Sequence, residues 1–308
     1  KEYLKKRLKE GRIKPLDPAP EFNEETIDKA ERFVGMMGEE PFLKAMENGA
    51  EVVLTGRSSD CAIYAGIPVR EGIPEGIAWH AAKILECGAA SVEQRKTADS
   101  LFVTCRNDHF DVEPLDDDLR CTPQSVASHS LYENADPFRL VESNGTMDLS
   151  TSVYEAIDDR RVRVSHSSFE PAECYTVKLE GAELVGYQTI VIGGVRDPYI
   201  LRQLDSWIDR IYANVHKRVQ DVYGDGIKRD DYTFHIRIYG KNGVMGPLEP
   251  IKEVTSHEVC LIMEATAPTQ EMATSVATIA RHKALHEPIP EWSGLITGLA
   301  CTYSPAHI

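Results

Sequence analysis

Alternation between short strand patterns and longer helical patterns is the feature that most limits the fold of this 308-residue chain. Residues 161–165 alternate apolar and polar side chains with the period of two expected of a half-buried strand, and residues 175–180 do the same. Strands and helices are then predicted in turn, over residues 186–192, 199–222, 232–239, 258–264 and 269–286. We therefore predict an α/β protein in which mixed sheets are flanked by helices.

The first half of the chain predicts the same class. An apolar run at residues 51–55 is typical of a short buried strand, and the turn Gly56-Arg57-Ser58-Ser59-Asp60 follows it. Asn23 precedes acidic residues and begins a broken helical stretch that runs to about residue 48. Further helices are predicted over residues 75–90 and 122–133, and further strands over residues 100–105 and 109–113.

The pattern changes near residues 143–160, which predicts two subdomains. Residues 1–150 are expected to form an α/β domain that contains the Gly56–Asp60 turn and lacks an N-terminal segment. Residues 151–308 are expected to form a second α/β subdomain of mixed strands and long helices.

The charge balance excludes one large class of function. Lys and Arg total 34 against 49 Asp and Glu, a net charge of −15, so affinity for a nucleic acid backbone is not expected. No apolar run approaches the roughly 18 residues of a membrane span, and no signal-peptide pattern follows the charged first residues. We therefore expect a cytoplasmic protein without membrane or nucleic acid partners.

The cysteines and histidines predict no metal site. Seven scattered cysteines contain no CxxC pair, and most are interpreted as small buried apolar residues. His282 and His286 share a helical face, but no third ligand and no HExxH glutamate accompany them. GxGxxG and the phosphate loop are absent from the sequence, so an enzyme that uses a nicotinamide cofactor or a nucleotide triphosphate is not expected, and no cofactor is predicted. GxSxG is absent too, so no hydrolase motif is present.

Two segments have the composition of an anion-binding turn. In the first, Gly56 allows a sharp turn, Arg57 adds a guanidinium, and the following helix start offers unpaired N–H groups. The alternative is that Arg57 and Asp60 simply pair with each other and stabilise the turn. In the second segment, Gly193, Gly194 and Arg196 precede the predicted helix cap Asp197-Pro198.

Two pairs of side chains could transfer protons. Lys178 and Glu180 lie two apart on a predicted strand and therefore face the same way, either as an acid–base pair or as an exposed salt bridge. His129 and Glu133 lie four apart on a predicted helix, where the carboxylate could orient the imidazole. A helical histidine can equally be a structural residue of the core.

Several longer segments resemble the acyclic terpene utilisation protein AtuA family, from about residue 50 to residue 305. The segments that carry the resemblance are Val53–Asp60 (VLTGRSSD), Trp79–Gly88 (WHAAKILECG), Arg120–Pro123 (RCTP), Ala127–Pro137 (ASHSLYENADP) and Tyr175–Gly181 (YTVKLEG). The positions that the resemblance marks are Gly56, Arg57, Asp60, His80, Glu86, Cys87, His129, Glu133, Asp136, Lys178, Glu180 and Gly181.

The resemblance implies a role in the breakdown of acyclic terpenes and related branched acids through coenzyme A thioesters. It also implies a further α/β segment before Lys1 and a small ferredoxin-like partner domain, with a homo-oligomer as the other expected assembly. We expect a hydratase or lyase that acts on a branched carboxylic acid or its coenzyme A thioester, which is then a substrate and not a cofactor. The alternative is a non-catalytic binding or assembly subunit of a degradation complex.

In the catalytic interpretation, the substrate is a small anion. Arg57 and the adjacent helix start hold its carboxylate or thioester oxygen. Lys178 or His129 moves the proton, and Glu180 or Glu133 sets the pKa of that group.

Overall fold

A computed structural model describes residues 1–16, 19, 21–94, 100–291 and 299–301 and divides the chain into two compact units. Unit 1 is Lys1–Glu183 and unit 2 is Leu184–Ile308. The division lies after the predicted boundary near residue 150. The cause is strand pairing, because β11 (Lys178–Glu183) is hydrogen-bonded to β1 (Ala30–Met36) near the start of the chain.

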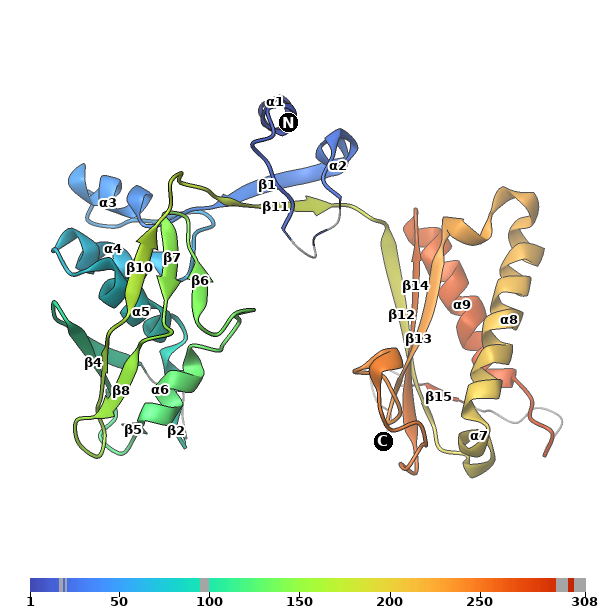
Figure 1. The fold of residues 1–308 in the computed structure, drawn as a ribbon. Helices are drawn as coiled ribbons and strands as arrows, with labels where there is room; N and C mark the ends of the chain where they lie inside the picture. The colour runs from blue at the N-terminus through green and yellow to red at the C-terminus, as the bar shows by residue number, and fades with distance from the viewer. Residues whose placement is uncertain (17–18, 20, 95–99, 292–298, 302–308) are drawn as a thin grey trace. The chain divides into compact units, whose positions relative to one another are not determined.

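Unit 1 combines six α-helices and several small antiparallel sheets in its described residues (Figure 1). The helices are α1 (Glu2–Lys9), α2 (Glu24–Lys29), α3 (Glu40–Glu47), α4 (Ala62–Arg70), α5 (Glu75–Glu86) and α6 (Pro123–His129). The largest sheet has the order β3-β4-β9-β8, formed by Leu101–Cys105, His109–Pro114, Val162–Ser165 and Val153–Ala156. One smaller sheet pairs β2 (Val92–Glu93) with β5 (Arg120–Cys121). Another has the strand order β10-β7-β6, formed by Ser168–Pro171, Gly145–Asp148 and Arg139–Val141.

Helix α5 is the centre of unit 1. Every residue from Gly76 to Ile84 is buried, including the polar residues His80 and Lys83. Ile77, Ala81 and Ile84 pack against the largest sheet, while Trp79 packs with a second core cluster and stacks on Phe169 at 5.9 Å between ring centroids. The predicted helix over residues 75–90 is confirmed for Glu75–Glu86.

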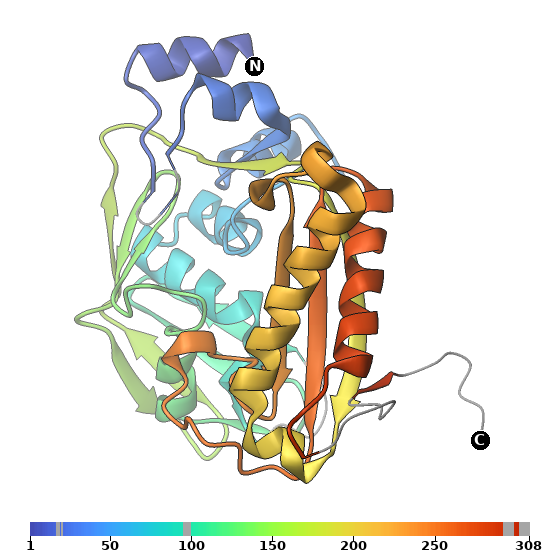
Figure 2. The same ribbon diagram turned by 90° about the vertical axis from the view of Figure 1, so that its right-hand side faces the viewer.

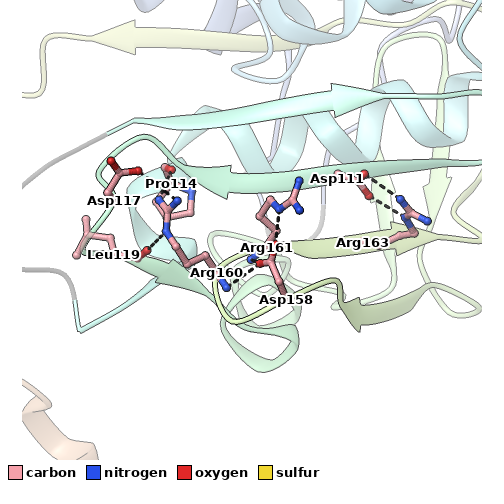
Figure 3. Close-up of polar contacts among 8 residues, drawn as sticks. All are labelled: Asp111, Pro114, Asp117, Leu119, Asp158, Arg160, Arg161 and Arg163. Atoms are coloured by element: carbon pink, nitrogen blue, oxygen red, sulfur yellow. Dashed lines mark hydrogen bonds and ion pairs between the residues drawn. The ribbon is translucent and has the colours of Figure 1, made fainter.

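Three arginines at the start of β9 tie the largest sheet to its loops (Figure 3). Arg160 donates to three backbone carbonyl oxygens, those of Leu119 at 3.0 Å, Pro114 at 3.1 Å and Asp116 at 2.7 Å. Arg163 lies directly opposite Asp111 on the neighbouring strand and pairs with both of its carboxylate oxygens, at 2.8 and 3.0 Å. Arg161 Nε donates to Asp158 Oδ2 at 2.7 Å, so all three guanidinium groups are engaged within the protein and we assign them structural roles.

Two predictions for the first half of the chain are wrong. Residues 51–55 form no strand, and the side chains of Val52 and Leu54 are 87% and 97% exposed. The helix that follows this segment, α4, begins at Ala62. The stretch predicted as helix up to residue 48 contains strand β1, because pairing with β11 outweighs the local helical preference.

Unit 2 has a single antiparallel sheet in its described residues, with the strand order β13-β14-β12-β15. The elements follow the chain as β12 (Tyr187–Val195), α7 (Pro198–Arg202), α8 (Leu204–Tyr223), β13 (Thr233–Tyr239), β14 (Val259–Ala267), α9 (Gln270–His286) and β15 (Ala300–Cys301). This β-α-β-β-α-β arrangement is ferredoxin-like. A fold of the kind that the resemblance implies for a partner domain is thus present within this chain.

Helices α8 and α9 cover the same face of the unit 2 sheet (Figure 2). Trp207, Ile211 and Val215 of α8 and alternate residues of β13 and β14 form one buried core. The predicted strands and the helix at residues 269–286 are confirmed, while the helix predicted over residues 199–222 is divided at Gln203 into α7 and α8. The predicted α/β class is thus confirmed.

No helix in the described part of the chain is both long enough and apolar enough to cross a membrane.

Candidate functional site

The first predicted anion-binding turn joins the predicted Lys178–Glu180 pair in one ion cluster on unit 1. Arg57 contacts Glu180 through two nitrogens, with Nε at 3.1 Å from Oε2 and Nη2 at 3.2 Å from Oε1. Lys178 Nζ lies 3.2 Å from Glu180 Oε1, and Asp60 Oδ1 lies 3.9 Å from Arg57 Nη1. Strand β11 carries Lys178 and Glu180, and the bridge between Met37 and Ser58 brings Arg57 to it.

The positive and negative charges of this ion cluster are paired with one another. Hydrogen bonds from Arg57, and then from Lys178, hold the pKa of Glu180 below its ordinary value, so this carboxylate is a weak base at neutral pH. The side chains of Arg57, Lys178 and Glu180 are each between one third and one half exposed. The arrangement is that of a surface salt-bridge cluster that fixes the Gly56–Asp60 segment to β11.

The predicted pairing of His129 with Glu133 is wrong. Helix α6 ends at His129, and Glu133 has a positive φ of 58°, so the two residues do not share a helical face. His129 is instead 3% exposed and stacks on Tyr132 at 5.7 Å. Neither of its ring nitrogens has a hydrogen-bond partner among the described residues. Burial, and then the charge of Lys83, lower the pKa of His129 and keep the imidazole neutral.

The second predicted turn is also different from the expectation. Gly193 and Gly194 lie inside β12 and pair with β14 and β15, so they form no phosphate-binding loop. Gly193 is needed for packing, because a Cβ there would lie 2.6 Å from the side chain of Leu299. Arg196 follows the strand and Asp197 caps α7, as predicted, accepting from the N–H groups of Tyr199 and Ile200.

A buried ion pair on α5 lies at the centre of a group that the sequence analysis did not assemble. Lys83 and Glu86 are one helical turn apart and form an ion pair in which the side chains are only 4% and 6% exposed. Lys83 Nζ also lies 5.7 Å from the centre of the Tyr132 ring, on which His129 stacks. An ion pair removed from water in this way costs desolvation energy, and functional sites are among the places where proteins retain one.

Two further carboxyl groups belong to the same region. Glu142 follows β6, and burial raises its pKa to about 7, aided by the charges of Glu86 and Glu39 and opposed by a Ser59 hydrogen bond and by Lys83. Glu39 precedes α3, is 4% exposed, and burial raises its pKa to about 7 as well. Asn144 donates to Glu39 Oε1 at 2.8 Å and connects the two segments.

We call Glu39, Lys83, Glu86, His129 and Glu142 the buried polar cluster. Several of its polar atoms have no hydrogen-bond partner in the described residues: Glu39 Oε2, Glu142 Oε2 and both His129 nitrogens, with Trp79 Nε1 and Asn144 Oδ1 beside them. Buried polar atoms are nearly always hydrogen-bonded in folded proteins. A concentration of unsatisfied donors and acceptors is therefore what a site for a polar ligand or for ordered water would look like.

A small apolar pocket lies next to Glu39. Its volume is about 120 Å³, and it is lined by Phe42, Leu43, Met46, Val53, Ile63, Gly66 and Ile67. Gly66 joins the pocket to the buried polar cluster, since a Cβ on Gly66 would lie 3.4 Å from Glu39 Cβ. The pocket can hold a small apolar group.

Part of the buried polar cluster could have been found from the sequence. Lys83 and Glu86 interrupt a run of apolar residues within a predicted helix, and Glu86 is among the positions marked by the family resemblance. Glu39 and Glu142 carry no comparable pattern, because they are brought together only by the tertiary fold.

His80, another position marked by the family resemblance, lies outside this cluster. It is fully buried, burial lowers its pKa to about 3, and its Nδ1 lies 2.7 Å from Ser167 Oγ.

Within the residues that the structure describes, no group of three or more His, Cys, Asp or Glu side chains is placed to hold a metal ion. The six cysteines that can be described are all free.

Comparison with known proteins identifies the family. The family model described as "Acyclic terpene utilisation family protein AtuA" matches residues 116–290, more than half of the chain. The chain therefore belongs to the acyclic terpene utilisation AtuA family. No curated protein and no solved structure matches it.

Proposed function

We propose that this chain is an enzyme, or the large subunit of one, that acts on a branched carboxylic acid or its coenzyme A thioester by hydratase or lyase chemistry. The observation that carries this proposal is the convergence in unit 1 of buried carboxyl groups and a neutral histidine with unsatisfied polar atoms. Family membership supports the branched, terpene-related character of the substrate. The buried polar cluster thereby replaces Lys178 and Glu180 as the proposed proton-transfer groups.

The chemistry needs one group that releases a proton and one that accepts it. In hydration of a double bond next to a thioester, a base takes a proton from water, the oxygen adds to the β-carbon, and an acid protonates the α-carbon. Glu39 and Glu142, each with a pKa raised by burial to about 7, are each close to half protonated at neutral pH. We assign these two carboxyls as the acid and the base, and the Lys83 ammonium as the charge that stabilises the developing enolate oxygen.

The apolar pocket supports a substrate with a short branched group. An apolar cavity of about 150 Å³ holds a ligand the size of benzene, so a pocket of about 120 Å³ suffices for a branched group of four or five carbons. In this proposal the branch enters between α3 and α4, and the carbonyl end lies against Glu39.

A thermal-shift panel tests the substrate class. Branched and unbranched acyl-coenzyme A esters, free coenzyme A and branched carboxylates are added separately to the protein. A ligand at about one hundred times its Kd stabilises the folded state by about 2.7 kcal/mol, which raises the melting temperature by several degrees. We expect a shift with the branched ligands and a loss of that shift in Ile67→Gln, which places a polar group in the pocket.

The matched control is Val153→Gln, because Val153 is also an exposed apolar residue of unit 1, at 41% against 48% for Ile67. The shift should survive in this variant. Equal shifts with branched and unbranched ligands would contradict the assignment of the pocket. No shift with any ligand would favour the non-catalytic subunit instead.

A further inference from the structure

Unit 2 has an open surface hollow of about 560 Å³, which we call the unit 2 cavity. It is lined by Arg196, Pro198, Leu201, Arg202, Ser256 and His257. This volume lies within the range of roughly 300–1,000 Å³ that is typical of sites for small organic ligands. Two of these lining residues, Arg196 and Arg202, carry guanidinium groups.

Arg202 is an uncompensated cation on this wall. Its guanidinium carbon lies 4.5 Å from the centre of the Tyr199 ring, and no carboxylate of the described residues forms an ion pair with it. Stacking on an aromatic face restrains the planar guanidinium and leaves its N–H edge available for an oxygen ligand. The Arg202 guanidinium is thus preorganised to bind an anion.

Arg196 is held in place by the loop that precedes β14. Its Nη1 donates to the backbone oxygen of His257 at 2.9 Å, and its Nε lies 4.0 Å from Glu258 Oε2. The carboxylate of Asp197 accepts two backbone N–H groups of α7. The nearby carboxylates therefore offset only part of the charge of the two arginines.

The rest of the wall indicates the kind of anion. The Ser256 hydroxyl donates to the backbone oxygen of Glu258 at 2.7 Å, so the arginines are left as the main donors. Pro198 and Leu201 add apolar surface on which the organic part of a ligand can lie. Guanidinium groups bind phosphate with two parallel hydrogen bonds, and a cavity of this size exceeds what a single small ion needs.

We propose that unit 2 carries a binding site for a phosphorylated organic anion, in which the phosphate groups are held by Arg202 and Arg196. The ligand class is a nucleotide diphosphate or a molecule that contains one. This proposal goes beyond the proposed function, which concerns unit 1 alone, and it stands or falls separately.

Isothermal titration calorimetry with ADP tests it on the whole chain, using inorganic pyrophosphate and malonate as comparison ligands. Arg202→Gln should weaken ADP binding about tenfold or more, as expected for the loss of charge-assisted bonds to phosphate. Arg202 is exposed, so the substitution leaves the core intact. Arg218→Gln on α8 is the control, since it removes an equal charge from an exposed position of the same unit.

We expect ADP to bind more tightly than pyrophosphate, malonate to bind weakly, and Arg218→Gln to match the wild type within about twofold. Absence of ADP binding at millimolar concentration would overturn the proposal. Equal loss in both variants would show a non-specific effect of charge and would overturn it too. Malonate binding as tightly as ADP would contradict the assignment to phosphate.

Discussion

Lys83→Met is expected to lower the free energy of unfolding of unit 1 by about 3–5 kcal/mol, because it leaves the carboxylate of Glu86 buried without a partner. The Glu86 side chain is only 6% exposed, so water cannot replace the lost ammonium. Replacing both partners by apolar residues removes the unpaired charge. The double variant Lys83→Met/Glu86→Leu should therefore recover most of the loss.

Urea unfolding followed by tryptophan fluorescence measures both variants, since Trp79 lies in the core beside Lys83. Lys29→Met is the control, because Lys29 is paired with Glu25 on the surface of α2 and should change stability by less than about 1 kcal/mol. A single Lys83→Met variant as stable as the wild type would show that this pair is reached by water. A double variant as unstable as the single one would show that the methylene packing of Lys83, and not its charge, carries the effect.

The contribution of Glu142 to the stability of unit 1 is expected to fall as the pH rises from about 4.5 to about 7. Glu142 has a raised pKa of about 7 in the folded state, against an ordinary value of 4.5, so the folded state holds a proton that the unfolded state releases. This contribution to stability is complete below pH 4.5 and is lost as the pH passes through 7. The expected slope is about 1.4 kcal/mol per pH unit for one such carboxyl.

Glu142→Gln isolates the effect, because the amide is nearly the same size as the carboxyl and does not titrate in this range. Urea unfolding of both proteins at several pH values should give a stability difference that changes by about 1.4 kcal/mol per pH unit over this range, because Glu39, His80 and His129 titrate in both proteins and cancel in the comparison. Glu170→Gln, at an exposed residue paired with Arg139, should behave as the wild type. Parallel slopes for Glu142→Gln and the wild type would mean that Glu142 titrates near its ordinary pKa.

The sequence predicted best those elements whose patterns are local. Helix α5 and strands β13 and β14 have long uninterrupted periodicities, and the structure places each of them within a few residues of the prediction. Strand β1 could not be predicted, because its residues favour a helix locally and become a strand only through pairing with β11, far along the chain. Residues 51–55 show the reverse error, since an apolar run alone does not provide a strand with a neighbour.

The site was predictable to a similar degree. The period of a strand is enough to place Lys178 beside Glu180, but not to show that Arg57 reaches across and engages the same carboxylate. The His129 prediction failed because Glu133 has a positive φ and lies outside the helix. Glu39 and Glu142 are separated by more than one hundred residues. Only the turn after β6 and the start of α3 bring their charges close enough to interact.

Turnover of a branched acyl-coenzyme A substrate by Glu142→Gln and by Lys178→Ala tests the central claim most directly. General acid–base groups typically contribute factors of 10²–10⁴ to the rate, so Glu142→Gln should lower kcat by at least about one hundredfold while the protein remains folded. Lys178→Ala should stay within about tenfold of the wild type, because Lys178 belongs to the surface ion cluster. Full activity in Glu142→Gln together with a large loss in Lys178→Ala would contradict the account and return the chemistry to the surface ion cluster.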